Sequence, residues 1–83
     1  MSEERNVDDI LNAADDSVSL INGVNDGSWN VEGLEQSEIN DMVQRNVDHL
    51  NIVLAYEEVV ADSRDKSSYS GAVSVGEAYI AAN

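Results

Sequence analysis

The stretch of this sequence best suited to binding chemistry is NGVNDGSWNVEG, from Asn22 to Gly33, which is rich in oxygen-bearing side chains. An EF-hand calcium loop needs oxygen ligands at positions 1, 3 and 5, a Gly at position 6 and a bidentate Glu at position 12. With Gly27 at position 6, Asn22 and Asp26 supply positions 1 and 5, but Val24 and Gly33 occupy positions 3 and 12. Because two ligands are missing, we interpret the stretch as a turn whose Asn and Asp side chains bond their own backbone.

Adjacent carboxylates are the second candidate for chemistry. They occur as Asp8–Asp9, Asp15–Asp16 and Glu57–Glu58. Neighbouring residues of a helix point about 100° apart, so these pairs do not converge on one proton or one metal ion. General acid catalysis also needs a carboxyl group whose pKa is raised by burial, whereas these residues fall on polar faces. The pairs therefore indicate solvated helix surfaces.

The chain has one histidine, His49, and no cysteine. No second His or Cys can join His49 in a metal site, and the sequence lacks both a GxSxG motif and a glycine-rich phosphate loop. His49 is expected to be a half-buried packing or interface residue. The sequence thus predicts a protein that is not an enzyme, with no catalytic residue, metal or cofactor.

The net charge of the chain limits the classes of partner that it can bind. Seventeen acidic and four basic residues give the 83-residue chain a formal net charge of −13. This balance disfavours binding to nucleic-acid phosphates and to anionic membrane surfaces. No apolar run approaches the ~20 residues of a membrane span. The acidic start, MSEERNVDDI, is not a signal peptide, so we do not expect secretion by that route.

Apolar periodicity predicts an all-α fold: a small antiparallel three-helix domain, 1–83, with a long central helix. The expected helices span residues 6–22, 37–61 and 68–82, with a loop over 23–36. Ser2 or Asn6 can cap the first helix, and Gly23 stands where a glycine often ends one. The segment AVSVG in the last helix also alternates like a strand. We favour a helix there, because Gly76 on the apolar face lets another helix approach closely.

Several residues have two interpretations. Trp29 and Val31 in the loop either cover the core or contact a partner. Ile52, Tyr56 and Val59 form a second apolar stripe on the central helix, which is either core or an interface, and the need for a two-sided central helix favours core. Asn46 and Glu57 project near the main apolar face of that helix. A buried Asn46 would need hydrogen-bond partners, such as the loop that holds Trp29. Glu57 can reach solvent at the helix end. Alternatively, both residues mark a hydrated interface with another chain.

Two stretches, MVQRNVDHLNIVLA (Met42 to Ala55) and GEAYIAAN (Gly76 to Asn83), resemble small, mostly uncharacterised proteins encoded by tailed bacteriophages. In that family a QRNVDHL-type helix is followed by a short linker and a GxAYI-type ending. The lead-in WNVEGLEQSEIN is also similar, so the resemblance runs from about Trp29 to Asn83. The linker EEVVADSRDKSS departs from the aromatic linker usual in the family, and the first helix lies outside the resemblance.

The resemblance implies a setting rather than a mechanism. It suggests a small non-enzymatic bacteriophage structural protein that binds other virion proteins on the capsid or tail, as a cement, adaptor or accessory subunit. The expected location is the virion after synthesis in the host cytoplasm, with homo-oligomers in the particle as one form. The alternative is an acidic regulatory binder, either a DNA-mimicking inhibitor or an assembly chaperone. The candidate partner-contact residues are Trp29, Val31, Ile52, Tyr56 and Val59.

Overall fold

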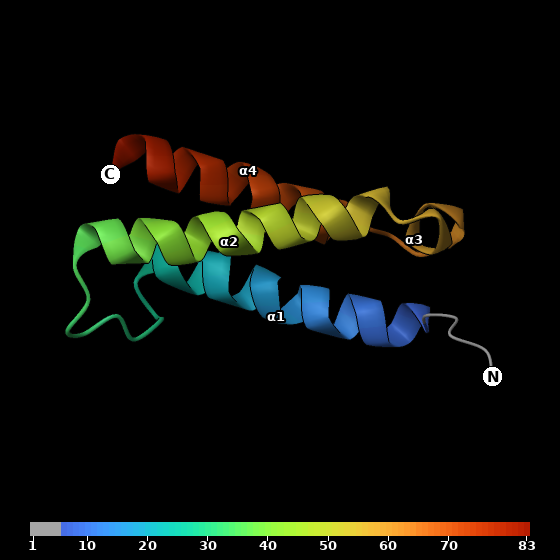
Figure 1. The fold of residues 1–83 in the computed structure, drawn as a ribbon, viewed down its shortest axis with the longest axis horizontal. Helices are drawn as coiled ribbons and strands as arrows, with labels where there is room; N and C mark the ends of the chain where they lie inside the picture. Colours follow the sequence, from blue (N-terminus) through green and yellow to red (C-terminus); the bar gives the residue numbers. More distant parts are fainter. Residues whose placement is uncertain (1–5) are drawn as a thin grey trace.

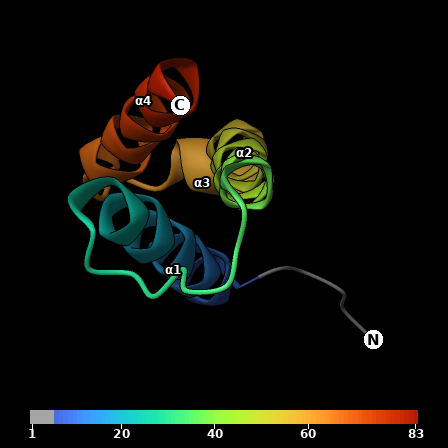
Figure 2. The ribbon, with the colours of Figure 1, turned by 90° about the vertical axis from the view of Figure 1, so that its left-hand side faces the viewer.

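The computed structural model describes residues 6–83. They form four α-helices: α1 (Val7–Asp26), α2 (Gln36–Ala55), α3 (Glu57–Ala61) and α4 (Ser67–Ala82). The three long helices lie side by side, and α3 sits at one end of the bundle (Figure 1). Seen end-on, they occupy the corners of a triangle (Figure 2). The prediction of an all-α fold is confirmed, and no strand occurs within residues 6–83; the described residues form four helices where three were predicted.

Helix α1 begins where the sequence indicates and ends later than predicted. The Asn6 side chain accepts a hydrogen bond from the Asp8 backbone N–H at 2.8 Å, which makes Asn6 the N-cap. The alternative cap, Ser2, lies outside the described residues. At the other end the left-handed residue is Gly27, with φ of 85°, rather than Gly23. The predicted loop 23–36 therefore shrinks to residues 27–35.

The predicted single helix 37–61 is divided at Tyr56, whose extended backbone ends α2 and begins α3. Two effects favour the break. Glu57 and Glu58 would face the negative C-terminal end of an unbroken helix, whereas they now lie in the first turn of α3, where carboxylates are favourable. The change of direction also places Val59 in the core, where it is fully buried. The expected long central helix is therefore wrong in two respects: α2 has 20 residues, like α1, and it does not lie between the other two, because α1 also packs against α4.

Segment 67–82 is a helix, as favoured, and Gly76 explains how α4 packs. A Cβ atom added to Gly76 would lie 2.5 Å from Val47 Cγ2, closer than real contacts allow. Only glycine fits this close approach between α4 and α2. The expectation that Gly76 lies on a helix–helix contact is confirmed.

The core is one cluster to which each of the four helices contributes. Its largest fully buried side chains share aliphatic character and fill the space between the helices: Leu11, Ile21, Val43, Val47, Leu50, Val53 and Val59. In Figure 1 the chain passes along α1, returns along α2 after the 27–35 loop, and passes along α4 after α3. The two ends of the bundle are therefore built differently, one by the 27–35 loop and the other by α3 and its linker to α4.

Candidate functional site

Trp29 stands at the first of these ends, packed onto α1. Its backbone N–H donates to the Gly23 carbonyl oxygen at 3.0 Å. A Cβ atom at Gly23 would come within 3.2 Å of both Cβ and Cε3 of Trp29, so the missing side chain makes room for the indole. Trp29 is nevertheless 40 % exposed. The residue therefore rests on the bundle while part of it faces solvent, and its contact with a partner stays a prediction.

Short hydrogen bonds give the loop around Trp29 a defined conformation. The Ser28 N–H donates to Asp26 Oδ1 at 2.9 Å, and the Glu32 N–H donates to Asn30 Oδ1 at 3.0 Å. These are the Asn and Asp turns expected from the sequence. The hydrogen bonds from Ser28, its hydroxyl first and then its N–H, lower the pKa of Asp26. Asn22 and Val24 belong to α1, so the stretch is not arranged as a calcium loop.

The loop leads into α2 through a capping box. The Glu35 side chain accepts from the backbone N–H of Glu38, and the Glu38 carboxylate accepts from the Glu35 N–H at 2.9 Å. Helix α2 therefore begins at Gln36, one residue before the predicted start. Leu34, just before the box, is 41 % exposed, while Val31 is half-buried against the core. Leu34 was not among the contact candidates predicted from the sequence.

The second apolar stripe does not form one surface. Val59 is buried in the core, Tyr56 is half-buried, and Ile52 on α2 is 54 % exposed. The break at Tyr56 separates the three, because an unbroken helix was needed to align them. Val59 is core, as favoured, and is no longer a partner-contact candidate. The favoured interpretation as core is wrong for Ile52, whose side chain is accessible on the surface of α2.

A polar cluster joins α1 to α2 inside the bundle. Ser17 is only 3 % exposed, and its Oγ lies 2.8 Å from both Asn46 Oδ1 and His49 Nδ1. The Asn46 amide nitrogen donates to the Met42 carbonyl oxygen at 2.8 Å. The loop holding Trp29 is therefore not the partner of Asn46. Glu57 is exposed at the start of α3 and takes no part.

The hydrogens available in this cluster determine which of its atoms donate and which accept. The bond to Met42 orients the amide, so Asn46 Oδ1 accepts the single hydroxyl hydrogen of Ser17. His49 Nδ1 must then donate to Ser17 Oγ. A catalytic base would instead accept the serine proton at that nitrogen. The cluster thus fixes the contact of α1 with α2 and does not activate Ser17 as a nucleophile. Ser17 was missed in the sequence, although it follows Ala14 by three residues on the apolar stripe of α1.

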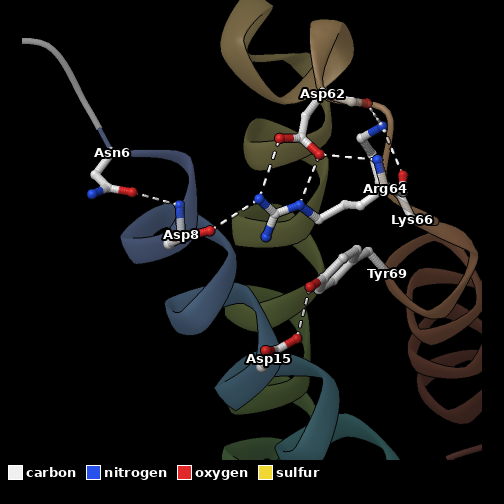
Figure 3. Close-up of polar contacts among 7 residues, drawn as sticks. All are labelled: Asn6, Asp8, Asp15, Asp62, Arg64, Lys66 and Tyr69. Carbon is white, nitrogen blue, oxygen red and sulfur yellow. Dashed lines mark hydrogen bonds and ion pairs between the residues drawn. The ribbon is translucent and has the colours of Figure 1, made fainter.

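The opposite end holds a network of charged and polar side chains (Figure 3). Arg64 donates to Asp62 at 2.7 Å and to Asp8 on α1 at 2.9 Å. These hydrogen bonds, that to Asp62 first, raise the pKa of Arg64, and Arg64 in turn lowers the pKa of Asp62. Lys66 donates to the carbonyl oxygens of Asp62 and Arg64, which places a cation at the negative end of α3.

Tyr69 extends this network into the bundle. Its hydroxyl donates to Asp15 Oδ1 on α1 at 2.8 Å, and the ring is buried. Burial first, and the hydrogen bond to Asp15 second, raise the pKa of Tyr69 to about 12. The contact ties the first turn of α4 to α1.

Residues 6–83 show no other kind of site. In that part of the chain no surface pocket opens, and no three His, Cys, Asp or Glu side chains gather to hold a metal ion. None of the described helices has the length and apolar character to cross a membrane. The exposed apolar side chains of the loop are the structure's best candidate for a binding surface.

Comparison with known proteins adds no relative: no protein-family model, curated protein or solved structure matches this chain.

Proposed function

We propose that this chain is a small non-enzymatic structural protein of a bacteriophage particle. It binds other virion proteins of the capsid or tail, as a cement, adaptor or accessory subunit, and reaches the virion after synthesis in the host cytoplasm. The proposal takes the three long helices as an antiparallel bundle that presents one end to its partner. The phage setting comes from the sequence resemblance carried by QRNVDHL and GEAYI.

One observation carries the binding role: Trp29 is held on Gly23 by a backbone hydrogen bond while the residue remains 40 % exposed to solvent. Large aromatic side chains dominate the energetics of protein interfaces when a partner buries them. Val31 supports the loop from its half-buried position, and Ile52 offers a second accessible apolar side chain on α2. Where several copies of the chain occur in one particle, contacts between neighbours are made through Trp29 or Ile52.

The test is stoichiometric incorporation into particles. The gene is altered in the encoding phage to give Trp29→Ala, and purified particles are assayed by quantitative mass spectrometry. We expect the unaltered chain in fixed copy number and a strong loss of the variant. Val60→Ala is the matched control, because Val60 is 65 % exposed on α3 at the other end of the bundle. Circular dichroism of both purified variants should show retained helix. Absence of the unaltered chain from particles would refute the proposal.

A second candidate, an acidic regulatory binder, is supported by the charge distribution. Residues 6–44 contain no Lys or Arg but include acids on α1, in the loop and on α2. A DNA-mimicking inhibitor would compete with duplex DNA for a DNA-binding protein. An assembly chaperone would be found with structural proteins in infected cells but not in finished particles, and the same mass-spectrometric measurement separates it from a resident subunit.

A further inference from the structure

The exposed apolar side chains are unevenly distributed. In the described part of the chain four large ones are exposed, namely Trp29, Leu34, Ile52 and Val60. Two of them, Trp29 and Leu34, belong to what we term the loop end, residues Asp26–Glu38. Grouped exposed apolar side chains with a polar surround are typical of interaction surfaces, whereas single ones are ordinary.

The loop end is also held in shape before any partner arrives. Gly27 and Gly33 adopt left-handed conformations, with φ of 85° and 87°. The Trp29 N–H is bound to Gly23, and the Leu34 N–H donates to the Val31 carbonyl oxygen at 3.0 Å. A loop already ordered by its own backbone loses little conformational entropy on binding.

The charge around these two side chains has one sign. Asp26, Glu32, Glu35 and Glu38 are all exposed at the loop end. The nearest bases along the chain are beyond it at Arg45, and Arg64 and Lys66 are engaged with α3 and its linker at the other end of the bundle. An acidic partner surface would be repelled here, while a basic one would be attracted.

We propose that the loop end binds a protein surface on which an apolar depression is rimmed by Lys and Arg side chains. Trp29 and Leu34 enter the depression, and the surrounding carboxylates face the basic rim. Arginine suits this rim best, since its guanidinium group can pair with Glu32 and stack on the exposed indole face. This inference rests on the proposed binding function and specifies the chemistry of the partner.

The experiment uses the full chain labelled with ¹⁵N and a synthetic peptide, acetyl-Arg-Leu-Arg-Gly-Leu-Arg-amide. Two control peptides replace either both leucines by glycine or the three arginines by glutamate. We expect saturable amide shift changes concentrated in residues 26–38 with the first peptide. The glycine peptide should give weak changes spread over all acidic surfaces, and the glutamate peptide none. Equal changes along the Asp8–Asp16 face of α1, or none at the loop end, would overturn the proposal.

Variants of the protein separate the two contributions. Trp29→Ala should weaken binding of the first peptide by about tenfold or more, as expected of an interface anchor. Glu32→Gln should weaken it severalfold and reduce its salt dependence. The matched control is Glu57→Gln, which removes the same charge from an exposed residue at the other end, and it should change little. Equal effects of Glu32→Gln and Glu57→Gln would show attraction by net charge alone and would contradict a site at the loop end.

Failure of this inference differs from failure of the proposed function. A chain that is present in particles but shows no loop-end response to the peptide keeps its virion role and loses the basic partner. A chain that responds as expected but is absent from particles keeps the basic partner and is instead a binder acting before or outside the particle.

Discussion

The loop end of the bundle differs from the opposite end in its charged contacts and in its exposed apolar side chains. We term that opposite end, formed by α3 and residues 62–66, the linker end. At the linker end Arg64 bridges Asp62 and Asp8, Lys66 covers carbonyl oxygens, and Val59 is buried. At the loop end carboxylates serve backbone N–H groups as turns and caps, and Trp29 and Leu34 remain exposed. The linker end places Arg64 and Lys66 among its acidic residues, whereas residues 26–38 of the loop end contain no Lys or Arg.

This difference indicates which end of the bundle would gain more contacts from a partner. At the linker end Arg64 pairs with two carboxylates and Val59 is buried, and Val60 is the single large apolar side chain of α3 that is exposed. The loop end is equally well ordered, yet its exposed indole and uncompensated carboxylates gain further contacts only from another molecule. Order alone therefore does not identify a binding surface; order combined with unburied apolar area and unpaired charge does.

The largest expected effect comes from two adjacent valines of α3. Val59 is fully buried and Val60 is 65 % exposed, although they differ only in the direction of their side chains. Val59→Ala should lower the free energy of unfolding by about 2 kcal/mol, while Val60→Ala should change it by no more than about 0.5 kcal/mol. Urea denaturation of both variants measures the difference. Equal midpoints would show that α3 does not close the linker end.

Tyr69→Phe tests the tie between α4 and α1 at the linker end. Loss of the hydrogen bond to Asp15 should lower the free energy of unfolding by about 1 kcal/mol near neutral pH. The folded pKa of Tyr69, about 12, lies above its ordinary value of 10.0, so folding favours the protonated phenol. The resulting stabilisation is complete below pH 10 and is lost as the pH rises towards 12.

The stability difference between the unaltered chain and Tyr69→Phe should therefore shrink between pH 10 and 12, as followed by chemical denaturation. Absorbance titration should also lose its step near pH 12 in the variant. A constant difference across this range would contradict the buried contact with Asp15.

A smaller effect is expected for Arg64→Gln, since its ion pairs are exposed to solvent and weakened by water. The melting temperature should fall slightly at low salt, and the fall should disappear at high ionic strength. Arg45→Gln on α2 removes the same charge away from the linker end and serves as the control. A larger fall for Arg45→Gln would mean that net charge, rather than the Asp62–Arg64–Asp8 contact, sets the stability.

The smallest expected effect is that of calcium on the loop end. Asp26 Oδ1 is already bound to Ser28, and Asn22 lies within α1. Millimolar calcium should leave the melting temperature and circular dichroism unchanged. A distinct upward shift of the melting temperature would indicate a cation site and would remove the basis for describing the loop carboxylates as partners for basic side chains.

Much of the fold could be predicted because periodicity and caps are local signals. The helical character of 67–82, the cap at Asn6 and the close approach at Gly76 all follow from residue type and spacing. The break at Tyr56 was not predicted, since no Gly or Pro marks it and one of the two effects that favour it, the burial of Val59, depends on how α3 meets the rest of the bundle. Gly23 resembled a helix end, but it serves the packing of Trp29 instead.

The candidate site was predictable only in part, for the same reason. Trp29 stands out by its type in an acidic loop, whereas the contact of Ser17 with Asn46 and His49 depends on how α1 meets α2. The stripe of Ile52, Tyr56 and Val59 was predicted on an unbroken helix. Because the helix breaks at Tyr56, the three side chains do not form one surface. Contacts that depend on the relative placement of two helices are not encoded in the spacing of either one.

The close approach at Gly76 also bears on how the molecule opens. Helix α4 has only 16 residues and includes Gly71, Gly76 and several β-branched residues, so it has little helicity of its own. The contact of Gly76 with Val47 therefore supports a helix that would be marginal in isolation. We expect amide hydrogens in the middle of α4 to exchange with solvent when α4 separates from the bundle.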